Sequence, residues 1–183
     1  MSTLHVENLK GLSSGGNANK VIIPSGQTLD ASNGFVTPAG HVIQVNQGSL
    51  NSATITTATF TDLGSLSITP KASTNKILVL FEQHIYVTEL SSNSWRGANV
   101  RLLRDTTTIY GDPADQYGES FHLEGNIDRY MTYSTRQYLD SPSTTSSVTY
   151  KVQGNSKGGL ASVLYNYHGY GSGGRITLME IAQ

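Results

Sequence analysis

The chain contains no cysteine, so it has neither a disulfide framework nor a thiolate metal site. Charge is also scarce: 14% of the residues are charged, the formal net charge is −1, and no basic run occurs. Such a sequence lacks the positive footprint of nucleic-acid binders. No apolar run reaches the ~18 residues of a membrane span, and the N-terminus lacks the basic and apolar regions of a signal peptide. These absences argue against nucleic-acid binding, membrane insertion and classical secretion.

Ser, Thr, Gly and Asn take the place of the missing charge, and apolar residues make up only 37% of the 183 positions. This composition is typical of many short strands joined by tight turns. The length suits one domain with a real core and a short appendage. No long helix-favouring run is present. The sequence therefore predicts an all-β protein.

The strongest structural signal is the segment from Lys76 to Val87. Every residue from Ile77 to Phe81 is large and apolar, which predicts a strand covered on both faces and placed in the middle of a sheet. From Glu82 onward the pattern alternates, so we expect one face to turn toward solvent or a partner chain. The side chains on that face are Glu82, His84 and Tyr86.

Residues 1–38 contain too few apolar side chains for their burial to offset the entropy lost on folding. We therefore interpret them as an attachment or stem segment. A flexible link at residues 13–19 and a very short strand at residues 20–23 fall within it. The apolar side chains expected to dock this segment on other chains are Leu4, Val6, Leu9 and Leu12.

Residues 39–183 carry eight to ten strand signals at the spacing of a sandwich. We predict a jelly-roll-like β-sandwich, with residues 98–104 as the neighbour of the central strand and a hairpin turn at Asp105. Eleven segments are the candidates for these eight to ten strands: residues 41–46, 53–61, 64–69, 76–87, 98–104, 108–110, 119–123, 129–138, 147–153, 161–168 and 175–181.

The sequence contains only incomplete matches to catalytic and metal-binding motifs. Residues 154–158 match G-x-S-x-G and residues 73–76 match S-x-x-K, but neither has the helix that the chemistry requires. An acidic segment has the oxygen ligands for Ca²⁺ without EF-hand spacing, and we interpret it as a solvated loop. No two histidines are spaced as zinc ligands, so we expect no cofactor and no enzyme activity. The acidic segment contains Asp112, Asp115, Glu119, His122, Glu124 and Asp128.

An ordered series of short blocks resembles a family of tail-fibre-like domains that recurs in marine phages. The opening resembles the leader of small virion proteins from cyanophages and similar phages. The domain blocks are Phe60-Thr61-Asp62-Leu63, Leu66-Ser67-Ile68-Thr69-Pro70, Lys76-Ile77-Leu78-Val79, Arg101-Leu102-Leu103-Arg104-Asp105, Tyr138-Leu139-Asp140-Ser141-Pro142, Val148-Thr149-Tyr150-Lys151-Val152-Gln153 and Ile176-Thr177-Leu178-Met179-Glu180-Ile181. Those of the leader are Met1-Ser2-Thr3-Leu4-His5-Val6-Glu7-Asn8-Leu9 and Ile23-Pro24-Ser25-Gly26-Gln27-Thr28-Leu29-Asp30.

The resemblance implies a structural protein of the virion whose leader attaches to the particle and whose C-terminal sandwich forms a homotrimeric knob. It leaves the position on the particle open. We favour a tail-fibre-like adhesin that contacts the host surface. The alternative is a decoration protein of the phage head, and a glycan or ester hydrolase is the third reading.

Aromatic side chains next to Asn, Ser and Arg form the remaining candidate site. They suit either a host-surface glycan, whose C–H groups stack on rings, or a subunit interface, which we favour because a trimer requires one. On a strand facing a threefold axis, His84 would meet its symmetry mates and make assembly acid-sensitive. The candidate residues are Trp95, Arg96, Tyr110, Tyr117, Tyr165, Tyr167 and Tyr170.

Overall fold

A computed structural model describes residues 11, 13–16, 18, 20–27, 38–90, 96–111, 119–123, 127–156, 162–167 and 173–183. Contacts between Cα atoms divide the chain into two units, Met1–Val36 and Thr37–Gln183. The described residues of the first unit contain no strand, and the prediction of a strand at residues 20–23 is therefore wrong. In this described part no second strand is present to form the backbone hydrogen bonds of a sheet. None of the described residues is helical, and this part of the chain therefore holds no helix that could cross a membrane.

The second unit is built from strands, as the alternating sequence predicted. The strands are β1 (Val42–Ser49), β2 (Ala53–Ile55), β3 (Thr61–Ile68), β4 (Lys76–Leu90), β5 (Arg96–Arg104), β6 (Thr107–Tyr110), β7 (Glu119–Leu123), β8 (Ile127–Asp140), β9 (Val148–Ser156), β10 (Ser162–Tyr165) and β11 (Arg175–Ile181). The hairpin expected at Asp105 joins β5 to β6, and Asp105 adopts a φ of 54° in its turn.

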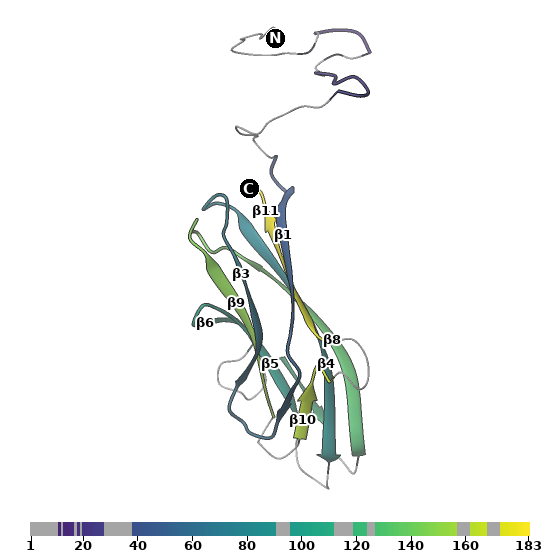
Figure 1. The fold of residues 1–183 in the computed structure, drawn as a ribbon, viewed down its shortest axis with the longest axis vertical. Helices are drawn as coiled ribbons and strands as arrows, with labels where there is room; N and C mark the ends of the chain where they lie inside the picture. The colour runs from purple at the N-terminus through teal and green to yellow at the C-terminus, as the bar shows by residue number, and fades with distance from the viewer. Residues whose placement is uncertain are drawn as a thin grey trace. The chain divides into compact units, whose positions relative to one another are not determined.

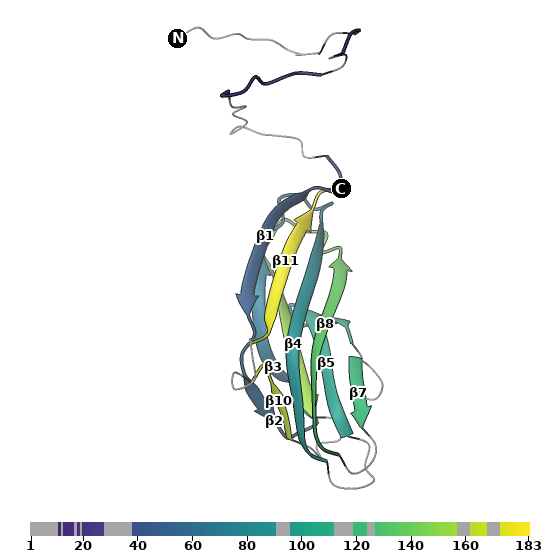
Figure 2. The ribbon, with the colours of Figure 1, turned by 90° about the vertical axis from the view of Figure 1, so that its right-hand side faces the viewer.

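The strands form two sheets that pack as the two layers of a sandwich (Figure 1). Sheet A runs in the order β1-β11-β4-β10-β2, with β8 paired to the other side of β4. Sheet B runs in the order β3-β9-β5-β6, with β7 also paired to β5. Figure 2 shows β1, β11, β4 and β8 following one another across the face of sheet A. All the recorded strand pairs are antiparallel.

This order is that of a jelly roll. Eight strands give the sheets β1-β11-β4-β8 and β3-β9-β5-β7, so the first strand lies beside the last and each layer mixes strands from both halves of the chain. Two nested Greek keys produce this arrangement. The predicted fold class, an all-β jelly-roll-like sandwich, is confirmed.

The central strand β4 lies in mid-sheet, as predicted. Its first half pairs with β11, its second half with β10, and nearly its whole length with β8. The prediction that residues 98–104 pair beside it is wrong, because they belong to β5 in sheet B. Both strands have an apolar inner face. This pattern fits two strands that face each other across the sandwich as well as two strands that pair within one sheet, so it does not distinguish the two arrangements.

Between the sheets lies one apolar core, drawn from the inward-facing residues of both layers. It comprises Leu50, Ile55, Leu63, Ile68, Ile77, Val79, Phe81, Ile85, Val87, Ala98, Val100, Leu102, Val148, Tyr150, Val152, Val163, Tyr165, Ile176 and Leu178. Polar contacts also join the layers. The hydroxyl of Tyr165 in β10 lies 2.8 Å from the carbonyl oxygen of Asn99 in β5 and 2.7 Å from that of Asn155 in β9.

Candidate functional site

The surface most unusual for a solvated protein is the outer face of sheet A. Along β4 the inward side chains are those of Ile77, Val79 and Phe81, and Leu78 and Leu80 point the other way. Both leucines are only half-buried. The prediction of cover on both faces is therefore wrong within one chain, because sheet B covers only the inner face.

Four apolar side chains form a straight row across this face, which we call the apolar row. Val45 of β1 lies opposite Met179 of β11, Met179 opposite Leu78 of β4, and Leu78 opposite Leu139 of β8. The ends of the row are the most open: Val45 is 54% exposed and Leu139 is 51% exposed. Tyr133 and Met131 lie on the same face of β8, beyond the polar Gln137 and Thr135. Exposed apolar side chains gathered on one face mark interaction sites.

A charged row lies four residues further along the same strands. Arg175 of β11 is the cross-strand partner of Glu82 of β4, which in turn lies opposite Thr135 of β8. All three side chains are exposed. Beside them is a hollow of about 310 Å³, lined by Gln47, Leu80, Phe81, Glu82, Thr135, Arg175 and Thr177. The face therefore carries an apolar band, and beyond it a band with one charge of each sign.

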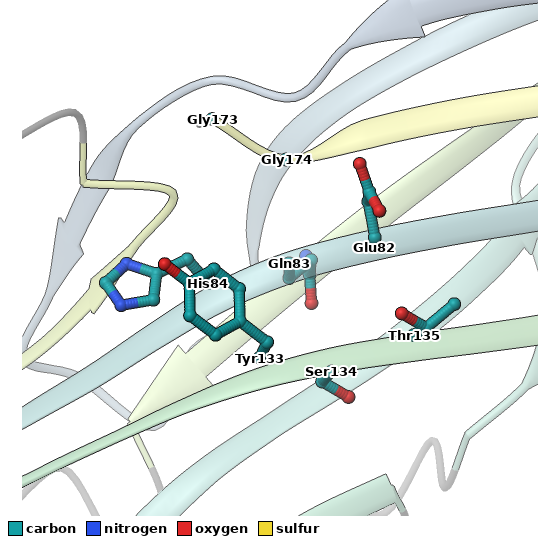
Figure 3. Close-up of a pocket in the computed structure, with 8 residues that line it drawn as sticks. All are labelled: Glu82, Gln83, His84, Tyr133, Ser134, Thr135, Gly173 and Gly174. Atoms are coloured by element: carbon teal, nitrogen blue, oxygen red, sulfur yellow. The ribbon is translucent and has the colours of Figure 1, made fainter. Parts of the chain in front are cut away.

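His84 lies on the outer side of β4 but is covered within its own chain. Its ring packs against the ring of Tyr133 (Figure 3). The ring centroids are 4.9 Å apart and the ring planes meet at 38°. His84 is 2% exposed and Tyr133 is 63% exposed. The expectation that His84 meets its symmetry mates does not fit this burial, because Tyr133 is the ring that this part of the face presents.

Next to this ring pair is a smaller hollow of about 60 Å³, lined by Gln83 and Ser134 as well as by the two rings. Among the described residues, neither ring nitrogen of His84 nor either polar atom of the Gln83 amide has a hydrogen-bond partner. Burial lowers the pKa of His84 from its ordinary value of 6.5, because the charged ring loses its hydration. The neutral imidazole is thus the form that this site favours.

The outer face of sheet B provides an internal comparison. Lys151 of β9 forms an ion pair with Asp62 of β3 at 3.0 Å, and Gln153 donates to the same carboxylate. Arg101 of β5 donates to Gln153 at 2.7 Å and lies over the ring of Phe60. None of the exposed large apolar side chains in the described part of the chain belongs to β3, β9, β5 or β6. The described side chains on the outer faces of β3, β9, β5 and β6 thus make polar contacts suited to water, in contrast to the outer face of sheet A.

Two buried carboxylates contribute to stability. Asp140 accepts hydrogen bonds from Tyr150 at 2.7 Å and Arg104 at 2.9 Å, which joins β8 to sheet B. Burial, with the bond to Asp140, raises the pKa of Tyr150 far above its usual value. Glu180 accepts from Asn75, Gln44 and the backbone N–H of Lys71. Burial alone would raise the pKa of Glu180, but these hydrogen bonds lower it. Neither carboxylate is left open for chemistry.

Several of the sequence-predicted site residues are structural. Tyr165 is fully buried in the core and therefore presents no receptor-binding ring, and Tyr110 is half-buried against Phe81 and Tyr138. Of that set, Tyr167 is exposed at the end of β10. Arg96 opens β5, but its side chain lies outside the described residues, as do Trp95, Tyr117, Tyr170, Leu4, Val6, Leu9 and Leu12.

The same holds for most of the acidic segment expected as a solvated loop or Ca²⁺ site, although residues 119–123 form β7 as predicted. In the described part of the chain, no three His, Asp or Glu side chains gather as metal ligands. Ser156 of the G-x-S-x-G pattern lies within β9 with its side chain buried, and not on a sharp turn before a helix. It therefore does not present a nucleophile.

The sequence reasoning missed Val45 and Leu139, which the structure places at the two ends of the apolar row. The signal was available on β8, where Met131, Tyr133 and Leu139 share one face at a spacing of two. The strand expected at residues 129–138 ends one residue before Leu139, so this side chain was not counted with the face.

No family model and no curated protein matches the chain. Solved structures of infectious bursal disease virus are similar to it. The crystal structure of the VP2 subviral particle has 14% identity and a TM-score of 0.37 over 88% of this chain and 42% of that one. The structure of the Gx strain has 10% identity and a TM-score of 0.35 over 87% and 40%. The chain thus spans about two fifths of the length of these structures.

Proposed function

We propose that the chain is a structural protein of a virus particle and not an enzyme, and that it forms a homotrimeric, fibre-like phage appendage that contacts the host surface. The observation that carries this proposal is the contrast between the two outer faces of the sandwich. The polar face of sheet B suits solvent, and the exposed apolar side chains of sheet A suit assembly.

Two further points support an assembling virion component. The jelly roll is the architecture of viral capsid and lectin domains, among others. The series of blocks from residue 60 to residue 181 resembles tail-fibre-like domains of phages. In this proposal residues 1–38 attach the protein to the particle.

Localisation on intact particles tests the proposal. Gold-labelled antibodies against residues 39–183 should decorate tail-associated fibres in electron micrographs of the virus that encodes the chain. Label on the head would favour the decoration protein instead. Absence of the protein from purified particles would refute both roles.

Host contact has its own test. Virions that carry Trp95→Ala or Tyr170→Ala should adsorb to cells more slowly than virions that carry His41→Ala, an exposed position at the start of β1. Equal adsorption by all three variants, with particles of normal composition, would remove host attachment from the proposal. It would leave a structural role in place.

A further inference from the structure

We propose that the outer face of sheet A across β1, β11, β4 and β8 is the surface on which a second copy of this chain docks. The copies form a closed head-to-tail ring whose axis runs along the strands, with Val45 at the β1 edge of one copy against Leu139 at the β8 edge of the next. This inference rests on the homotrimer of the proposed function and names the surface that joins its subunits.

The first step is that the face requires cover. Of the large apolar side chains that are exposed in the described part of Thr37–Gln183, five lie on this one face. They are Val42, Val45, Met131, Tyr133 and Leu139. Removing such side chains from water stabilises an assembly in proportion to the area buried. Tyr and Met are also enriched at interfaces.

The second step is the position of the two most open members of the apolar row. Val45 and Leu139 belong to β1 and β8, the opposite edges of this part of the sheet in the described residues. Met179 and Leu78 between them are already half-buried. The largest gain in burial therefore comes from joining the β1 edge of one copy to the β8 edge of another. Such a contact is heterologous, and it closes into a ring when the rotation allows.

The third step is charge complementarity within the neighbouring row. When the axis of the ring runs along the strands, the rotation that relates two copies causes no shift along the strands. The apolar row and the charged row of one copy therefore lie at the same heights along the axis as those of the next copy. Glu82 lies on β4, toward the β8 edge, and Arg175 lies on β11, toward the β1 edge. Joining unlike edges places opposite charges on the two sides of the junction, with β8 and β1 between them, whereas joining like edges would place equal charges there. Complementary charges fix register and exclude wrong pairings.

The cysteine-free sequence allows a direct test by cross-linking. Within one chain, Val45 and Leu139 are three strand spacings apart, or about 14 Å. A disulfide requires Cα atoms within about 7 Å, so this pair cannot close inside a subunit. The variant with Val45→Cys and Leu139→Cys should form covalent dimers and trimers under oxidation, which disappear with reductant.

The matched control is an equivalent row on the outer face of sheet B. Ser65, Lys151, Leu103 and Thr108 lie opposite one another on β3, β9, β5 and β6, so Ser65 and Thr108 are also three spacings apart. The variant with Ser65→Cys and Thr108→Cys should remain a single chain on the same gel. Equal ladders from both double variants would mean random collision and would overturn the inference.

Paired charges provide a second measurement that does not depend on oxidation. Val45→Lys or Leu139→Glu alone should reduce the mass in solution from three chains to one, or 19.7 kDa. The two changes combined should restore the trimer, since each contact then holds a Lys–Glu pair between copies. Circular dichroism of each variant reports folding, and the Cys variants provide the answer if a charged one fails to fold.

The outcomes separate this inference from the function on which it rests. A wild-type protein that is trimeric, with no cross-link at positions 45 and 139, overturns the surface and keeps the trimer. A wild-type dimer or tetramer that cross-links there keeps the surface and overturns the trimer. A wild-type protein that is a single chain at all concentrations overturns both. Single charge variants that remain trimeric, or a double variant that remains monomeric, overturn the contact between Val45 and Leu139.

Discussion

Gly154 in β9 provides the sharpest test of the packing between the sheets. A Cβ atom at this position would lie 2.6 Å from Cζ of Tyr165 and 2.9 Å from Cε1 and Cε2 of the same ring. The ring cannot move aside, because its hydroxyl is held by the carbonyl oxygens of Asn99 and Asn155. We therefore expect Gly154→Ala to force the two sheets apart locally.

Overpacking of a closed core costs about 1–3 kcal/mol, and a ring fixed at its far end places this variant near the upper value. A loss of about 3 kcal/mol lowers the Tm by roughly 6–12 °C in a protein of this size. Urea unfolding followed by circular dichroism measures the change in the free energy of unfolding. Wild type and variant require the same protein concentration, since association alters apparent stability.

Gly48→Ala in β1 is the matched control, because the nearest atom to its added methyl is the flexible Cδ1 of Leu66 at 3.3 Å. It should change the free energy of unfolding by less than about 1 kcal/mol. Tyr165→Leu, which removes Cζ and the hydroxyl, completes a double-mutant cycle with Gly154→Ala. The double variant should cost less than the sum of the single variants by about 1–3 kcal/mol. Additive costs, or a wild-type stability for Gly154→Ala, would refute the steric argument.

Three further predictions concern buried polar groups. Tyr150→Phe removes the hydroxyl that donates to Asp140 and should lower the free energy of unfolding by about 1.5–3 kcal/mol in urea titrations. An unchanged urea midpoint would contradict a stabilising role for this hydrogen bond between the sheets. Asn166 has a φ of 51°, and its side chain forms hydrogen bonds with the backbone of His84 and Asn51. Asn166→Ala should therefore lower the free energy of unfolding by about 2–3 kcal/mol in the same assay, and Asn166→Gly should lower it less, because glycine adopts a positive φ without strain. Equal losses for the two variants would argue against backbone strain. The folded state lowers the pKa of His84, so the neutral ring contributes its full share of stability above pH 6.5, and that share is lost as the pH falls through the lowered pKa. The thermal midpoint of His84→Gln should therefore fall less between pH 7 and pH 5 than that of the wild type. Parallel pH profiles of the two proteins would contradict this.

The sequence predicted the positions of the strands better than their neighbours. Residues 175–181 were placed with the bounds of β11, because Ile176 and Leu178 alternate with Arg175 and Thr177. Residues 119–123 were predicted only as a possible strand in the least regular part of the chain, and they form β7. The segment 53–61 was predicted as one strand, but Ala53–Ile55 forms β2, the chain bends at residues 57–59, and Thr61 already belongs to β3. A run of threonines fits either face, so the pattern held no information on where pairing ends.

The candidate aromatic site was predicted less well, for a physical reason. Tyr165 has a polar hydroxyl and an apolar ring, so its composition suits a surface and a core equally. What decides its burial is a pair of carbonyl groups on the opposite sheet and the space above Gly154, and both arise only after the sandwich has closed. Selecting aromatic residues by their polar neighbours in the sequence therefore placed this ring in the wrong environment.

The same limit explains why the segment from Ile77 to Phe81 has the pattern of a strand buried on both faces. A strand sequence records how much cover its side chains require, but not which molecule supplies it. Sheet B covers Ile77, Val79 and Phe81, while Leu78 and Leu80 share their side of the sheet with Val45 and Leu139 and remain open within one chain. If a second copy supplies the missing cover, the two-faced apolar pattern was a correct signal of burial. A single subunit then meets only half of it.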